Sequence, residues 1–196
     1  QTGIWARIFD PNGGEIRSDF HINSTTSANA WDQQIAGLSN GGFVVSWQDN
    51  GGADLEIRAQ RFDANGDAVG SEIQVNSENA GWHFSSAITG IANGGFVVTW
   101  IGAVGEGWEA QAQIFNSNGE RVGSEIHVNT AAGSYPDIPT ITELANGGFV
   151  ISWFDYGNNP SGVWAKVFDS HGGVVGSEFH VNATTSDWTW APKVTG

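Results

Sequence analysis

The sequence predicts an all-β fold, a four-bladed β-propeller made of four 53-residue units of which the last is incomplete. The first reason is a spacing of 53 residues that never slips, as in the column Phe9, Phe62, Phe115 and Phe168. Columns of Asn, Gly and Trp repeat at the same spacing, and a fixed period of this size is typical of repeat architectures. The second reason is composition, because 28 Gly, 11 Phe and 10 Trp indicate tight turns that join short, aromatic-rich strands.

Each unit begins with a short strand and a tight turn. The first strand is expected at residues 34–38, 87–91, 140–144 and 193–195. An Asn-Gly-Gly turn follows at residues 40–42, 93–95 and 146–148. Asn-Gly is among the strongest hairpin signals because both residues tolerate a positive φ.

Three further strands complete the unit. The second strand reads FVVSW, FVVTW or FVISW, and alternation places Phe43, Val45 and Trp47 on one face. The third strand reads IWARIFD, IRAQRFD, AQAQIFN or VWAKVFD, and the fourth reads DFHIN, EIQVN, EIHVN or EFHVN. A turn rich in Asp, Asn and Gly joins the third strand to the fourth. Four antiparallel strands at this period match one blade of a β-propeller.

The chain is expected to be a single repeat domain, 1–196, with units at 1–53, 54–106, 107–159 and 160–196. Four complete units would need 212 residues, so 16 are absent, and the gap matches residues 144–159 with their second strand. The N-terminal segment then supplies a third and a fourth strand that lack a second one. We expect an open strand edge there, which invites self-association, and a chain that is a fragment of a longer array or a trimmed product.

The sequence motif of the unit resembles that of a known family. GGFVVSW, followed by IRAQRFDANGDAVGSEIQVN, is similar to the tandem repeats of roughly 50 residues in large secreted bacterial proteins, many of which carry calcium-binding RTX segments. The resemblance implies a secreted, extracellular location and an adhesive or binding role. The nonapeptide G-G-x-G-x-D that binds calcium in RTX segments does not occur in this sequence.

Charge and composition exclude several partners. The formal charge is −14, from 7 basic and 21 acidic residues, which argues against nucleic acid and against an anionic membrane surface. No apolar run approaches the roughly 20 residues that cross a bilayer, so no membrane insertion is expected. The chain has no Cys, so it has neither a disulfide nor a thiolate ligand.

The two ends of the predicted blades differ in sequence. Turns after the first and third strands share one end and repeat with little change, whereas connections after the second and fourth strands share the other end and vary. Loops on a rigid scaffold are the usual place for binding residues, and aromatic rings stack on sugar rings while nearby acids bind hydroxyls. The predicted ligand-binding residues at the variable end are Trp31, Trp82, Trp108, Tyr135, Asp155, Tyr156, Trp188 and Trp190. In contrast, Trp47, Trp100 and Trp153 share one column at the end of an apolar strand, which indicates core between blades.

No catalytic motif stands out. The sialidase Asp-box, a G-x-S-x-G elbow and H-E-x-x-H do not occur, and no spacing singles out a carboxylate pair among the many acids. Asp63, Asn65 and Asp67 offer oxygen ligands at alternate positions of a turn, as calcium loops do, but hairpin chemistry explains them without an ion. The sequence therefore predicts a non-catalytic, lectin-like binding module for a glycan or cell-surface polysaccharide, without a cofactor. Alternatives are a structural or protein-interaction segment of an adhesin and, less favoured, a carbohydrate-active hydrolase.

Overall fold

The computed structural model describes residues 3–24, 30–51, 54–77, 81–129, 133–157, 161–182 and 193. These residues form fourteen strands in four antiparallel sheets and no helix. Sheet A holds β1 (Trp5–Phe9) and β2 (Glu15–His21). Within the described ranges there is thus no helix that could serve as a membrane span. The predicted all-β class is confirmed.

Each of the other sheets contains four strands in chain order, as the sequence predicts. Sheet B holds β3 (Ala30–Gly37), β4 (Phe43–Asp49), β5 (Glu56–Phe62) and β6 (Ala68–Gln74). Sheet C holds β7 (His83–Gly90), β8 (Phe96–Val104), β9 (Gly107–Phe115) and β10 (Arg121–His127). Sheet D holds β11 (Pro136–Glu143), β12 (Phe149–Asp155), β13 (Gly162–Phe168) and β14 (Val174–His180).

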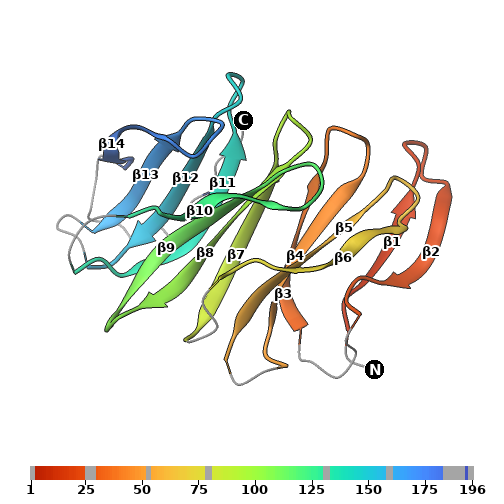
Figure 1. Cartoon of the computed structure of the whole chain (residues 1–196), viewed down its shortest axis with the longest axis horizontal. Coiled ribbons are helices and arrows are strands. Elements are labelled where there is room, and N and C mark those ends of the chain that lie inside the picture. The colour runs from red at the N-terminus through yellow and green to blue at the C-terminus, as the bar shows by residue number, and fades with distance from the viewer. Residues whose placement is uncertain are drawn as a thin grey trace.

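The sheets follow one another across the molecule from A to D (Figure 1). Three apolar clusters lie between A and B, between B and C, and between C and D. No backbone pairing joins sheet A to sheet D among the described strands. The fold is therefore propeller-like, with four successive sheets, but these strands do not close a ring through hydrogen bonds.

In sheets B, C and D the second strand is largely buried on both faces, and its buried side chains include the small polar Ser46, Thr99 and Ser152. In β4, Val45 and Trp47 pack toward sheet A, whereas Val44 packs toward sheet C. Trp47, Trp100 and Trp153 are completely buried in these clusters, which confirms that their column is core between sheets.

The repeated glycines of the Asn-Gly-Gly turns have separate tasks. In the turn of sheet B, the Asn40 side-chain oxygen accepts a hydrogen bond from the backbone N–H of Gly42 at 3.0 Å. Gly41 has a φ of +86°, where a Cβ would be strained. Gly42 lies against the backbone oxygen of Phe62, so a Cβ there would collide with the end of β5. The turn thus holds the start of the second strand close to the end of the third.

The first strands begin about four residues earlier than the sequence pattern indicates. β3, β7 and β11 each contain a register shift, and at that place Asp32, Ser85 and Ile138 have φ values of +52°, +53° and +47°. One left-handed residue inside a strand makes a bulge, which interrupts the two-residue alternation that sequence reading depends on. Trp31 consequently lies on β3 and not in a loop.

Candidate functional site

We call the end of the sheets with the 40–42, 63–67 and equivalent turns the turn end, and the opposite end, with the connections after the second and fourth strands, the loop end. The two types of turn do meet at the turn end, since a groove there is lined by Asn93 of one type and Asn116 and His171 of the other. The predicted division into two ends is therefore present in the structure.

The base of the loop end is built from the repeated Asn column. Each of these side chains accepts a hydrogen bond through its Oδ1 atom from the backbone N–H at the start of the third strand, 19 residues earlier. The pairs are Asn23 with Ile4 (2.8 Å), Asn76 with Ile57 (2.9 Å), Asn129 with Ala110 (2.6 Å) and Asn182 with Val163 (2.7 Å). Asn23, Asn76 and Asn129 are buried, so this column serves the scaffold.

Asp155 belongs to that base and not to the exposed surface. Its carboxylate is fully buried and accepts hydrogen bonds from the Ser134 hydroxyl, the Tyr135 N–H (3.1 Å) and the Gly157 N–H (2.9 Å). The sequence predicts that Asp155 contacts a ligand, but in the structure its carboxylate is buried and engaged by the two loops, so it is not exposed to one. An acid at the end of an apolar strand resembles an exposed loop residue in sequence, but here it connects the two loops of sheet D.

Two tyrosines stand on the loops that Asp155 connects. Tyr135 and Tyr156 are both exposed, and the Tyr156 N–H donates to the Tyr135 backbone oxygen at 3.1 Å. The Tyr156 ring leans on Phe154, with ring centroids 4.6 Å apart. Partial burial, with a further contribution from the charge of Asp137, raises the pKa of the Tyr156 hydroxyl. The structure thus brings Tyr135 and Tyr156, both predicted ligand-binding residues, together near the carboxylate of Asp137.

The tyrosine pair stands on closely packed backbone. Gly157 directly follows Tyr156, and a Cβ at this position would collide with the Gly133 carbonyl oxygen and lie 2.8 Å from the Tyr135 ring. Together with the hydrogen bonds to Asp155, this close approach restrains both loops. Aromatic side chains on a restrained backbone lose little entropy on binding.

Sheet C repeats part of this arrangement. Trp82 occupies the repeat position of Tyr135, is 60% exposed, and accepts through its backbone oxygen a hydrogen bond from the Ala103 N–H at 3.1 Å. Trp108 is half-buried. Its ring packs edge-on against Phe84, with ring centroids 5.1 Å apart, and against the core between sheets C and D. Trp108 therefore offers less free surface to a ligand than Trp82.

The remaining predicted aromatic residues fall into two groups. Trp31 is exposed near the start of β3, so sheet B also carries an aromatic side chain at this end. Trp188 and Trp190 lie outside the described residues. Exposed aromatic residues thus stand at the loop end of three consecutive sheets, B, C and D.

In the turn with Asp63, Asn65 and Asp67, the Asp63 carboxylate is used within the turn and Asp67 is used in an ion pair with a neighbouring sheet. Oδ1 of Asp63 accepts the backbone N–H groups of Asn65 and Asp67, both at 2.9 Å, and Asp67 pairs with Arg17 of sheet A at 2.8 Å. Asp10, Asn116 and Asp169 make the same two backbone hydrogen bonds in the other units. Across the described ranges, no three His, Asp or Glu side chains are grouped so that they could hold a metal ion.

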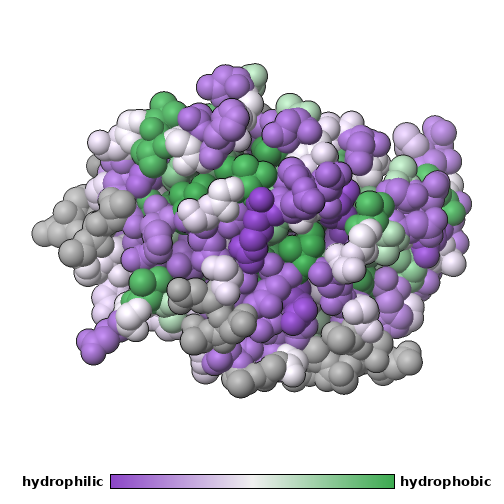
Figure 2. Space-filling view, viewed as in Figure 1, coloured by the Kyte–Doolittle hydropathy of each residue, from purple (hydrophilic) through white to green (hydrophobic). Residues whose placement is uncertain are grey.

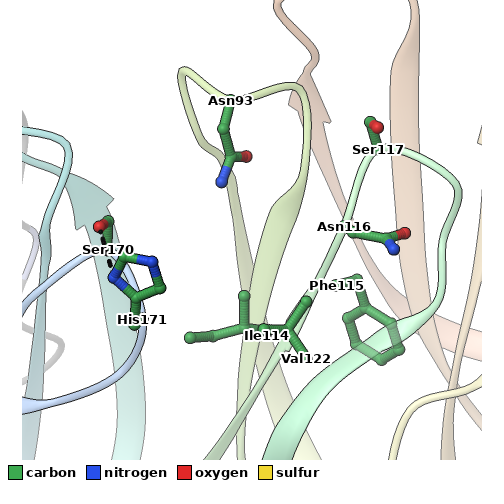
Figure 3. Close-up of a pocket in the computed structure, with 8 residues that line it drawn as sticks. All are labelled: Asn93, Ile114, Phe115, Asn116, Ser117, Val122, Ser170 and His171. Atoms are coloured by element: carbon green, nitrogen blue, oxygen red, sulfur yellow. Dashed lines mark hydrogen bonds between the residues drawn. The ribbon is translucent and has the colours of Figure 1, made fainter.

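Two grooves between sheets are lined by none of the aromatic residues predicted to bind a ligand. One of about 190 Å³, at the turn end between sheets C and D, has Ile114 and Val122 at its floor and Asn93, Ser117 and His171 around it (Figure 3). A second, of about 310 Å³, lies between sheets A and B beside His21 and Glu72. The face in Figure 2 is mostly hydrophilic, with small separate hydrophobic patches.

No protein-family model matches the sequence, and no curated protein is similar to it. Several solved structures are similar in fold, among them two at 14% identity. A mutant of the NanB sialidase from Streptococcus pneumoniae has a TM-score of 0.53, over 81% of this chain and 25% of the sialidase chain. The endo-arabinase from Bacteroides thetaiotaomicron has a TM-score of 0.56, over 88% of this chain and 68% of its own. This chain spans a quarter of the sialidase, and the likeness shows a shared propeller-like fold.

Proposed function

We propose that this chain is a non-catalytic carbohydrate-binding module of a secreted, extracellular protein, and that the exposed aromatic residues of the loop end make the contacts. The observation that carries the proposal is the placement of Trp31, Trp82, Tyr135 and Tyr156, which are exposed at one end of three consecutive sheets. Exposed aromatic rings give a large contact area at low entropy cost and can stack on sugar rings, which supports a binding role for this end.

The chemistry of the tyrosine pair fits a sugar. Each ring can stack on the apolar face of a pyranose or furanose, and Asp137 beside Tyr156 can accept hydrogen bonds from sugar hydroxyls. Trp82 and Trp31 lie on neighbouring sheets and not in one pocket. We infer a ligand that runs across several sheets, which is an extended polysaccharide and not a single monosaccharide.

We also infer that the four sheets are four blades of a propeller. Sheet A supplies only the third and fourth strands of its blade, whereas sheets B, C and D are complete. The rings of the loop end would then surround one rim. This view is supported by the three apolar interfaces, which join successive sheets in the same way.

A hydrolase is the second candidate because the fold is shared with a sialidase and an endo-arabinase. Against it stands the use of the most buried loop-end acid, Asp155, in backbone hydrogen bonds. A structural or interaction segment of an adhesin is the third candidate. The three differ in outcome: a module binds glycan without cleaving it, a hydrolase releases sugar, and a structural segment does neither.

The decisive experiment is a polysaccharide array, followed by calorimetry on the ligands that bind, with and without EDTA. We expect Trp82→Ala and Tyr135→Ala to weaken binding at least tenfold, which corresponds to about 1.4 kcal/mol. Phe9→Ala is the matched control, because Phe9 is as exposed as Tyr135 but lies at the turn end of sheet A, and it should bind like the wild type.

Several results would contradict this function. Release of reducing sugar would support the hydrolase, and the absence of any glycan ligand would support the structural segment. Equal loss in the Phe9 and Trp82 variants would show that the loop end has no special role. Loss of binding in EDTA would show that an ion contributes.

A further inference from the structure

Strand β1 has an edge without a partner among the described residues. In sheets B, C and D the third strand of the unit lies between the second and the fourth, as β5 lies between β4 and β6. β1 is the third strand of its own unit, and within the described part of the chain it pairs with β2 alone. An edge of this kind presents free backbone N–H and C=O groups to another chain.

The side chains next to this edge lack the cover that their equivalents have. In each complete sheet a Phe of the second strand stacks on the repeated Phe of the third, with ring centroids 5.1, 4.8 and 5.1 Å apart in Phe43–Phe62, Phe96–Phe115 and Phe149–Phe168. Phe62, Phe115 and Phe168 are consequently 3%, 0% and 1% exposed. Phe9, in the same column, is 55% exposed.

A second aromatic position repeats this difference. Four residues after the stacked Phe, the second strand carries Trp47, Trp100 or Trp153, and these lie opposite Arg58, Gln111 and Trp164 of the third strand. Trp5 occupies that column in β1 and is 48% exposed. The edge therefore lacks an aromatic partner at two positions whose spacing is that of Phe and Trp in the missing type of strand.

We propose that the free edge of β1 binds an extended segment of the pattern F-V-[VI]-[ST]-W, the second strand of another 53-residue unit. The segment would run antiparallel to β1, with its Phe opposite Phe9 and its Trp opposite Trp5. Backbone hydrogen bonds supply affinity in this mode of recognition, and side chains at alternate positions supply specificity. The site lies on sheet A, so it does not depend on glycan binding at the loop end.

The test uses a synthetic peptide with the sequence of residues 40–50, NGGFVVSWQDN, added to the whole protein. Alternate amides of β1 already face β2, so we expect exchange of the remaining amides of residues 5–9, which face the open edge, to slow at least tenfold at saturating peptide. Exchange in β14, the last strand of sheet D, should stay the same. The melting temperature should rise with peptide concentration, since the peptide binds the folded state.

Matched variants separate strand pairing from general adhesion. A peptide in which the Phe and Trp are replaced by Ala should bind at least tenfold more weakly. Phe9→Ala should weaken the original peptide to the same extent. Phe179→Ala removes a comparably exposed ring, 47% exposed on β14, and should leave peptide affinity unchanged, as should Trp82→Ala.

Three outcomes would overturn the proposal. One is a folded protein that does not bind the peptide at any concentration. Another is equal affinity for the peptide without its Phe and Trp. The third is a dimer that forms through β1 and excludes the peptide, because the occupant of the edge would then be a second copy of this chain.

Discussion

The turn end and the loop end differ in what their side chains contact. At the turn end, the repeated Asp and Asn side chains accept backbone hydrogen bonds of their own turns, so the scaffold uses them fully. At the loop end, a buried base of Asn129, Asp155 and their equivalents supports exposed rings such as Trp82 and Tyr135. The repeated Asp and Asn side chains therefore serve internal contacts, whereas the exposed rings on a restrained backbone are available to a ligand.

The largest difference in unfolding free energy should appear when a buried Trp of the scaffold and an exposed Trp of the loop end are each replaced by Ala. Trp100 is fully buried between sheets B and C, and its Nε1 donates to the Gln111 side chain at 2.9 Å. We expect Trp100→Ala to lower the free energy of unfolding by about 3–5 kcal/mol, through lost burial and a cavity. Trp82→Ala should change it by less than about 0.5 kcal/mol. Urea unfolding measures both, and similar losses would abolish the distinction between scaffold and surface.

An intermediate loss of unfolding free energy is expected for Asp155→Ala. This variant tests whether the base of the loop end is structural. Asp155→Ala leaves the Tyr135 and Gly157 N–H groups without their acceptor, and we expect a loss of about 2–3 kcal/mol in unfolding free energy. Glu106→Ala is the control, because Glu106 is exposed in a loop-end turn of sheet C and its loss should be near zero. If Asp155→Ala keeps full stability but loses glycan affinity, Asp155 contacts the ligand after all.

The smallest effect belongs to the turn end and depends on pH. Backbone hydrogen bonds from His171 and Gly173 hold the pKa of Asp169 below its ordinary value of 3.8. A lowered folded-state pKa means that the stabilisation is present above pH 3.8 and is lost as pH falls through the folded-state pKa. Asn116 occupies the same column, so Asp169→Asn should preserve the turn while removing the titration.

The check is urea unfolding of wild type and Asp169→Asn from pH 7 to pH 2.5. We expect similar stability near neutral pH and a relative loss in the wild type as pH falls below 3.8. Parallel stability curves over the whole range would show that the repeated acid of this turn contributes nothing through its charge.

Much of the scaffold follows from sequence because its causes are local. The Asn-Gly-Gly and Asp-x-Asn-Gly turns use contacts within five residues, and alternation in FVVSW leads to buried faces. The bulges at Asp32, Ser85 and Ile138 could not be read in the same way, because a left-handed residue in a strand leaves no composition signal. They shift the strand starts and place Trp31 within β3.

The candidate site was predictable as a region but not residue by residue. Exposed rings at the loop end, Trp31, Trp82, Tyr135 and Tyr156, agree with the sequence expectation about where aromatic surface would gather. Asp155 and Trp108 do not, since the first is buried by two neighbouring loops and the second by Phe84 and the core. Contacts between segments that lie far apart in the chain decide such cases.

By itself, the sequence determined the all-β class, the 53-residue unit and the order of its strands, because turn chemistry and alternation are short-range properties. Alternation predicted the buried Trp column, but only the tertiary structure decided burial at Phe9, Trp108 and Asp155, where burial depends on the neighbour that the side chain meets. Phe9 and Phe62 occupy one column, yet Phe62 is covered by a stacked Phe while Phe9 is open to solvent. The same residue in the same repeat therefore serves as core in one sheet and lies exposed at an unpaired edge in another.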